Sequence, residues 1–205
     1  MRVKVQKVLV VVLFVGSLSF LCSCYTVGPK FTLPNTDELQ LGKLQPTNCI
    51  AHFGKPTSTA IKTTVGASYV DYKYDDSLVR AFSVSERVMF LEFKNGKLNG
   101  YCLWSSFNKD KTKFDMKNVD NVKAGVGKLT ERDVLNILGK PNAKAFCPTT
   151  IEELKEDCST NTEVWGWYMR GKSGADPARF DVSQIYIWFD AAGKISSVEA
   201  SERKE

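Results

Sequence analysis

The polar and apolar positions of residues 127–141 predict a short helix whose start and stop are both encoded. Thr130 and Asp133 stand three positions apart, which is the spacing of a capping box at a helix N-terminus. Gly139 can adopt the positive φ that ends a helix, and Pro141 prevents its continuation. The apolar face between these signals consists of Val134, Leu135 and Leu138.

The same frame occurs earlier in the chain, at residues 42–56, without a gap. Both stretches begin with Gly-Lys-Leu and end with Gly-Lys-Pro. Pro46 occupies the first helical position, where its missing N–H costs nothing. The core positions of this copy are taken by Cys49, Ile50 and Phe53. We interpret the match as an internal duplication.

Three runs with strand character follow each helix pattern. After the first helix they are residues 69–74, 87–93 and 98–104, and after the second they are residues 163–169, 184–189 and 195–200. Asn95 and Gly96, between two of these runs, are a strong hairpin signal. The sequence therefore predicts an α+β fold of two tandem repeats, each with one or two short helices packed on a three-stranded antiparallel meander.

Length and composition are compatible with this duplication. The 205 residues, 43% hydrophobic and 25% charged, have room for one large domain or two small ones. We assign residues 1–23 to a signal peptide, 24–36 to a tether, 37–106 to the first repeat, 107–117 to a linker and 118–205 to the second repeat.

The N-terminus resembles a bacterial lipoprotein signal. A basic start is followed by an apolar run at residues 8–21, too short to span a membrane comfortably, and by a lipobox-like tetrapeptide at residues 21–24. The resemblance implies that Cys24 becomes the lipidated N-terminal residue; an uncleaved signal anchor is the alternative. Because Tyr25 rather than Asp follows Cys24, we expect a lipid anchor in the outer membrane that leaves the protein facing the periplasm.

Most of the net positive charge belongs to the targeting segment. Residues 1–23 hold three positive charges and no negative ones, so their removal lowers the formal net charge from +5 to +2. No stripe of lysine and arginine with interleaved aromatics remains, because residues 109–117 alternate basic with acidic side chains. We therefore expect no nucleic-acid partner.

Cysteine usage fits an oxidising compartment. Four cysteines remain after Cys24, an even number that allows three disulfide connectivities. We favour Cys147–Cys158, within an insertion at residues 142–162, and Cys49–Cys102, within the first repeat. The alternative for Cys49 is a small buried hydrophobic residue on the core side of its helix.

The usual catalytic and metal-binding patterns are absent from the sequence. It contains one histidine, His52, no Cys-x-x-Cys pair and no Gly-rich phosphate loop after a strand. The neighbouring carboxylates Glu152 and Glu153 fit a helix surface better than an acid–base pair. We therefore expect no enzyme activity, no cofactor and no metal.

Alternation along the strands suggests a binding surface. If one face of each strand packs against helices, Tyr186, Trp188 and Phe90 point to the other face, while Trp165 and Trp167 share one side of their strand. Exposed aromatic side chains often dominate protein interfaces, so we take these five residues as candidate partner-binding residues. The alternative is that Tyr186, Trp188 and Phe90 are buried where the two repeats pack together.

Three motifs of the second repeat resemble the SmpA/OmlA (BamE-like) lipoproteins: residues 127–141, the Trp-x-Tyr-type strand at residues 165–168, and the Phe-Asp-x-x-Gly-x-Ile hairpin at residues 189–195. Tandem copies of such a unit are similar to the β-lactamase inhibitor protein fold, in which a sheet surface grips another protein.

The resemblance implies a small, non-catalytic, partner-binding lipoprotein of the outer membrane. We expect a protein that acts as a scaffold for envelope proteins, for example in the assembly or maintenance of outer-membrane β-barrels. The alternative is an inhibitor or sequestering factor for a periplasmic protein, and a third interpretation is an enzyme accessory that binds lipid or peptidoglycan.

Overall fold

A computed structural model describes residues 25–62, 66–78, 83–110, 114–152, 154–155, 158, 160–172 and 180–204. The predicted signal peptide and Cys24 lie outside these residues. Within them, no helix is long and apolar enough to cross a membrane.

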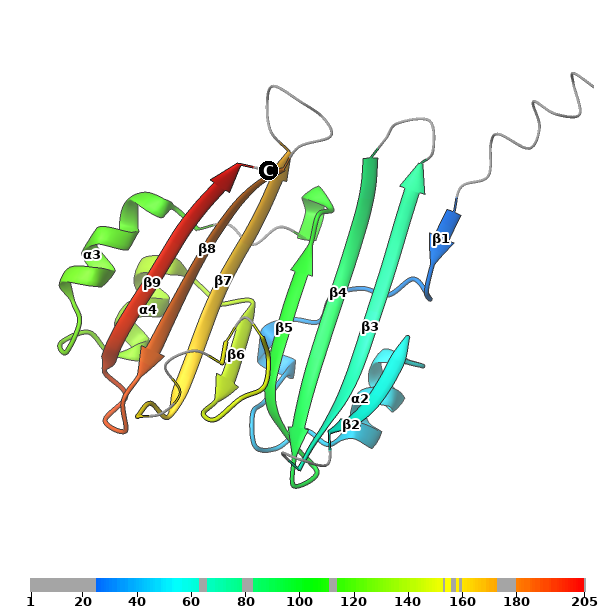
Figure 1. The fold of residues 1–205 in the computed structure, drawn as a ribbon, viewed down its shortest axis with the longest axis horizontal. Coiled ribbons are helices and arrows are strands. Elements are labelled where there is room, and N and C mark those ends of the chain that lie inside the picture. The colour runs from blue at the N-terminus through cyan, green and yellow to red at the C-terminus, as the bar shows by residue number, and fades with distance from the viewer. Residues whose placement is uncertain are drawn as a thin grey trace, which may run out of the picture.

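All described strands belong to one antiparallel sheet of nine strands (Figure 1). Their order across the sheet is β1-β3-β4-β5-β6-β7-β8-β9, and β2 pairs with a different part of β3 than β1 does. The strands are β1 (Tyr25–Val27), β2 (Ser58–Lys62), β3 (Ala67–Leu78), β4 (Ser83–Lys94), β5 (Lys97–Ser105), β6 (Ala143–Phe146), β7 (Glu163–Lys172), β8 (Phe180–Phe189) and β9 (Ile195–Lys204).

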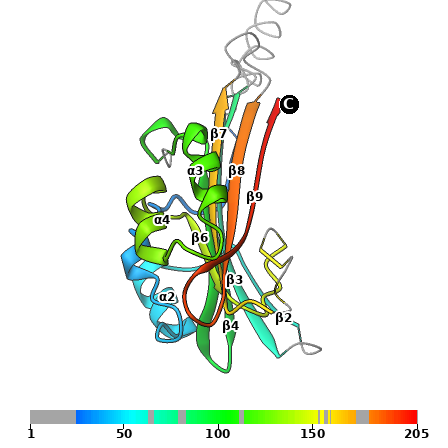
Figure 2. The ribbon, with the colours of Figure 1, turned by 90° about the vertical axis from the view of Figure 1, so that its left-hand side faces the viewer.

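Among the described residues, three short α-helices pack on one face of this sheet, as Figure 2 shows. They are α2 (Pro46–Phe53), α3 (Val119–Ala124) and α4 (Glu131–Leu138). Single turns of 3-10 helix occur at Thr36–Glu38, Asn108–Asp110 and Met116–Asn118.

The predicted fold class of two tandem helix-plus-meander repeats is wrong. The described chain is one continuous sheet, made mostly of strands, with three short helices. Its two halves are joined by β6, which pairs with β5 at Cys102↔Ala143 and with β7 at Ala143↔Gly166. β6 lies within residues 142–162, which the sequence analysis predicted to be an insertion. Its backbone hydrogen bonds to β5 and β7 join the two predicted repeats into one sheet.

Several local predictions are confirmed. Thr130 and Asp133 form the expected reciprocal capping box, with Thr130 N donating to Asp133 Oδ2 at 2.9 Å. Pro46 is the first residue of its helix. The hairpin between β4 and β5 turns at Asn95 and Gly96, with φ of 51° and 70°. These features are decided by neighbouring residues, which is why short-range patterns predict them.

In the part of the chain that the structure describes, buried side chains form three clusters, two on the helix-covered face and one on the opposite face. Beneath α2 lies the first cluster, which includes Cys49, Tyr72, Met89, Leu91 and Phe93. The second lies beneath α3 and α4 and includes Val134, Trp165, Trp167, Ile185 and Phe189. The third, on the helix-free face, consists of Ala143, Ala145, Ile151, Leu154, Val164 and Trp188.

Candidate functional site

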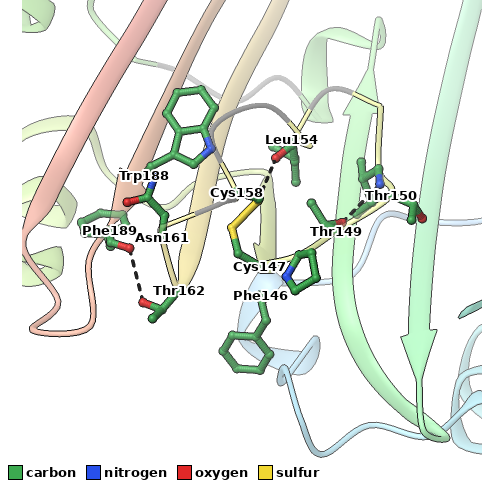
Figure 3. The surroundings of a disulfide bond; sticks show 12 residues. Phe146, Cys147, Thr149, Thr150, Leu154, Cys158, Asn161, Thr162, Trp188 and Phe189 are labelled. Atoms are coloured by element: carbon green, nitrogen blue, oxygen red, sulfur yellow. Dashed lines mark hydrogen bonds between the residues drawn. A yellow bond between two sulfur atoms is a disulfide. The ribbon is translucent and has the colours of Figure 1, made fainter. Parts of the chain in front are cut away.

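The helix-free face carries a loop that a disulfide closes on itself. Cys147 and Cys158, 11 positions apart in sequence, are joined by this bond, as predicted. We call residues 147–158 the clipped loop; it connects β6 to β7 and lies on the side of the sheet away from the helices (Figure 2). Figure 3 shows Leu154 and Trp188 beside the disulfide.

Small residues in the sheet make room for the clipped loop. A Cβ atom on Gly100 would lie 2.8 Å from Ile151 Cδ1 and 2.6 Å from the Ala145 Cβ, closer than real Cβ contacts. A Cβ on Gly166 would lie 3.2 Å from Leu154 Cδ2. Ile151 and Leu154 are 1% and 0% exposed, so they act as apolar anchors that seat the loop on the sheet.

A buried carboxylate holds the start of the clipped loop. Glu92 on β4 is 0% exposed and accepts hydrogen bonds from Thr149 Oγ1 at 2.6 Å, Thr150 N at 3.0 Å and Thr150 Oγ1 at 2.8 Å. Asn99 Nδ2 donates a further bond at 3.0 Å, and Lys94 Nζ lies 3.9 Å away. These partners satisfy the buried carboxyl oxygens and fix the loop to the strand.

The predicted partner-binding aromatics divide between the two faces. Tyr186, Trp188 and Phe90 belong to the cluster on the helix-free face, as the alternation predicts. Trp188 is nevertheless only 1% exposed, because the clipped loop packs against the same cluster, whereas Phe90 and Tyr186 are partly buried. Trp165 and Trp167 are 1% and 0% exposed beneath α3 and α4, so they are core residues and not surface residues.

The predicted Cys49–Cys102 disulfide is wrong, because no bond joins these two cysteines. Cys49 lies in the cluster beneath α2, while Cys102 packs with the cluster on the helix-free face, so the sheet separates them. Burial raises the pKa of Cys49 to about 11. Cys49 is therefore the small buried hydrophobic residue of the alternative interpretation.

Trp165 brings two titratable groups together on the helix-covered face. Lys144 Nζ lies 3.5 Å from the centre of the indole ring, and Trp165 Nε1 donates to Glu163 Oε1 at 2.6 Å. Burial lowers the pKa of Lys144 and raises the pKa of Glu163. Both groups line a groove of about 300 Å³ whose wall includes the exposed side chains of Leu135 and Phe146.

Asn142 has a structural role in the sheet that the sequence analysis did not predict. It precedes β6, is 7% exposed, and uses its side chain and backbone to join β5 and β7. Asn142 Nδ2 donates to Leu103 O and Tyr168 O at 2.9 Å each, and Asn142 Oδ1 accepts from Tyr168 N at 2.8 Å. A Pro-Asn pair after a helix carries no local signal of this cross-strand role.

Other chemistry is limited among the described residues. They contain no group of three or more His, Cys, Asp or Glu side chains that could hold a metal ion. His52 lies at the surface of α2, where its Nε2 is 3.0 Å from Glu38 Oε2. Both side chains are about half exposed or more, so this pair contributes little to stability.

Comparisons with known proteins do not assign the chain to a family. No family model matches it, and neither does any curated protein, so the resemblance to SmpA/OmlA lipoproteins stays a prediction. Among solved structures, the chain is similar to a "putative beta-lactamase inhibitor protein" from Streptococcus mutans, at 11% identity and a TM-score of 0.44. The match covers 80% of this chain and 91% of that one.

Proposed function

We propose that this protein is a non-catalytic binding protein of the bacterial envelope, held to the outer membrane by a lipid on Cys24, that grips a partner protein with the clipped loop. The observation that carries the proposal is the way in which the loop is fixed. A disulfide, two buried apolar anchors and a buried carboxylate all hold one short segment against the sheet.

Rigidity of this kind favours binding. A loop that is already ordered loses little conformational entropy when a partner docks, so more of the contact energy appears as affinity. Binding residues are also often carried on loops that a rigid scaffold positions. Glu152 and Lys155 project from the clipped loop with side chains 79% and 47% exposed, and their charged groups are 2.5 Å apart.

A groove beside the clipped loop gives the surface an apolar element. It has a volume of about 350 Å³ and is lined by Phe90, Val88 and Trp104 from the sheet and by Ile151 and Glu152 from the loop. A partner side chain of aromatic or aliphatic type would fill such a groove, with the loop charges at its rim. Interfaces are commonly organised in this way, with a buried anchor surrounded by polar contacts.

Site-specific photo-crosslinking in the native envelope tests the location of the binding surface. A benzophenone amino acid at Glu152 or Lys155 should give a defined crosslinked product, and the same probe at Asn136, exposed on α4, should give none. The product should be lost when Phe90 is changed to Ala in a protein that still unfolds cooperatively. Equal crosslinking from Asn136, or persistence in the Phe90 variant, would contradict the proposal.

The identity of the captured protein separates scaffold from inhibitor. A β-barrel assembly or maintenance component supports the scaffold role. A periplasmic enzyme whose activity falls when the purified chain is added supports the alternative of an inhibitor or sequestering factor.

The lipid anchor is tested separately. A Cys24→Ala variant should accumulate as an unlipidated precursor that takes up no labelled palmitate, whereas a Cys22→Ala variant should be labelled normally. Normal labelling of the Cys24 variant would remove the anchor from the proposal.

A further inference from the structure

The groove beside the clipped loop has its floor on three neighbouring strands, β3, β4 and β5, which Figure 1 shows side by side. The register places Asp71 opposite Phe90 and Phe90 opposite Cys102, so these residues form one row across the sheet. Val88 pairs with Trp104 in a second row on the same face. The floor therefore combines one carboxylate with apolar and aromatic side chains.

The clipped loop forms the opposite wall of the groove. Thr150, Ile151 and Glu152 line it from this side. The loop is held in this position because the Tyr69 hydroxyl, two residues before Asp71 on the same face of β3, is hydrogen-bonded to the Thr150 side chain. The groove is thus a preformed hollow, with a volume of about 350 Å³.

Two aromatic rings supply apolar walls. The Phe90 ring lies 5.3 Å from the ring of Tyr69, and the Trp104 ring lies 6.1 Å from the ring of Tyr168. These neighbours hold the two rings in place, and both Phe90 and Trp104 stay partly exposed. The face of an aromatic ring attracts cations and also packs well against an aliphatic stem.

Asp71 is a carboxylate whose charge is incompletely compensated. Among the described residues its side chain accepts one long hydrogen bond, from Ser58 Oγ at 3.4 Å, and forms no ion pair. Lys73 acts on it from a distance, but that ammonium pairs with Asp75 and Glu86 at 3.4 and 3.5 Å. Burial raises the pKa of Asp71, and this effect exceeds the opposing effects of Ser58 and Lys73.

The charge of the groove is negative. Asp71 and Glu152 line it, and no basic side chain does so among the described residues. Glu152 pairs with Lys155, but both side chains are largely exposed, so this pair is weak. Arg170 lies near the Trp104 ring outside the groove, where its charge acts on Glu86. A cation is therefore the occupant that complements the groove.

We propose that the groove beside the clipped loop binds an arginine side chain of the partner protein, whose guanidinium pairs with the Asp71 carboxylate and stacks on the Phe90 ring. The aliphatic stem of arginine suits the apolar walls, and its planar head can bond a carboxylate through two N–H groups while stacking on an aromatic ring. The compact ammonium of lysine lacks this geometry. The inference rests on the function proposed for the clipped loop, and it names the chemistry of the partner at that surface.

Fluorescence polarisation with the full-length chain in neutral detergent tests the choice of side chain. The probe is a fluorescein-labelled Ser-Gly-Val-Arg-Val-Gly-Ser peptide, and its matched control carries citrulline, which has the shape of arginine without the charge. The arginine peptide should bind at least fivefold more tightly than the citrulline peptide. Equal affinity, or no binding of the arginine peptide below 1 mM, overturns the proposal.

Variants then locate the binding. Asp71→Asn, which keeps an acceptor for Ser58, should abolish the preference for arginine, whereas Asp71→Glu should retain it. Glu199→Gln, at an exposed position of β9, should also retain it. Should the Asn variant unfold, Phe90→Leu decides the matter, with an expected loss of at least threefold in affinity for the arginine peptide. An unchanged preference in the folded Asn variant, or unchanged affinity in the Leu variant, overturns the proposal.

The Asp71→Asn change also separates this inference from the function on which it rests. In the native envelope, the crosslinked product from the probe at Lys155 should be lost in this variant. A product that persists there but is lost in Phe90→Ala supports the clipped loop as a binding surface and overturns the arginine. If the native chain gives no product, the proposed function fails, and the peptide measurements decide whether the groove selects arginine.

Discussion

Asn142 shows how one side chain can substitute for a strand. Where β6 has not yet begun, this residue supplies the hydrogen bonds that a further ladder residue would give to β5 and β7. An asparagine can do this because its amide carries two donors and an acceptor in one plane, matching the peptide group that it replaces.

Replacing Asn142 by Ala should lower the free energy of unfolding by about 3 kcal/mol. Leu103 O and the N–H and C=O of Tyr168 lose the hydrogen bonds that the Asn142 side chain makes with them. Each lost bond to a buried group costs about 1–3 kcal/mol, and water that enters the space left by the side chain would partly offset this cost. Urea unfolding measures the change. Asn136→Ala, on the exposed surface of α4, is the matched control and should change stability by less than about 0.5 kcal/mol.

Glu163 should make stability fall as the solution becomes less acidic. Burial raises its pKa in the folded state, so the folded chain holds this proton more tightly than the unfolded chain does. The contribution is therefore fully present below the unfolded pKa, about 4.3, and is lost as pH rises through the raised folded pKa. A Glu163→Gln variant, which keeps an acceptor for Trp165 Nε1, should not show this loss.

Urea unfolding of both proteins between pH 4 and pH 7 checks this sign. The stability of the Gln variant relative to the native chain should increase with pH across that window, and Glu199→Gln, at an exposed position of β9, should follow the native profile. Parallel profiles for the native chain and the Glu163 variant would show that burial does not raise this pKa.

The clipped loop is an element whose order comes from covalent and polar contacts more than from secondary structure. Its disulfide closes a short loop, and its apolar anchors lie over glycine and alanine in the sheet. Each contribution is modest, but together they fix a segment that contributes no strand to the sheet among the described residues.

Changing both Cys147 and Cys158 to Ser should lower the free energy of unfolding by about 3 kcal/mol. The chain-entropy treatment gives this magnitude for a loop closed between residues 11 positions apart. Thermal or urea unfolding measures it, and the native chain unfolded in reductant should match the variant. A loss below about 1 kcal/mol would contradict the expectation that the bond stabilises the fold by restricting the unfolded chain.

The whole molecule is organised by one sheet, not by two separate meanders. Because β6 pairs on both sides, unfolding either half exposes the backbone edge of the other. The cores beneath α2 and beneath α3 and α4 lie on the same face and share that sheet as their floor. Cooperative unfolding as a single unit is the physical consequence.

Two probes, one in each half, test this expectation. Cys49 is 0% exposed and can be labelled by a thiol reagent only after its half opens, and three of the four tryptophans, at positions 165, 167 and 188, report on the other half. The urea midpoints from pulsed labelling of Cys49 and from tryptophan fluorescence should coincide. Separate midpoints would instead support the boundaries at residues 37–106 and 118–205, which stay a prediction.

Short-range features of this protein were determined by the sequence itself. The capping box at Thr130, the proline start of α2 and the turn at Asn95 and Gly96 follow from residues a few positions apart. The bond between Cys147 and Cys158 joins residues 11 positions apart, within one loop. The face to which each strand residue points was predictable for the same reason, since alternation is a property of the strand backbone.

Tertiary structure decided everything that depends on distant segments. The strand at Ala143–Phe146 is short and alanine-rich, with weak intrinsic strand preference, and exists because β5 and β7 offer it partners on both sides. Its pairing turned two expected repeats into one sheet, placed Cys49 and Cys102 on opposite faces, and set the clipped loop over Trp188. The face to which a strand side chain points is decided by the local backbone. Whether that side chain is buried depends on which segments, distant in the sequence, pack against that face.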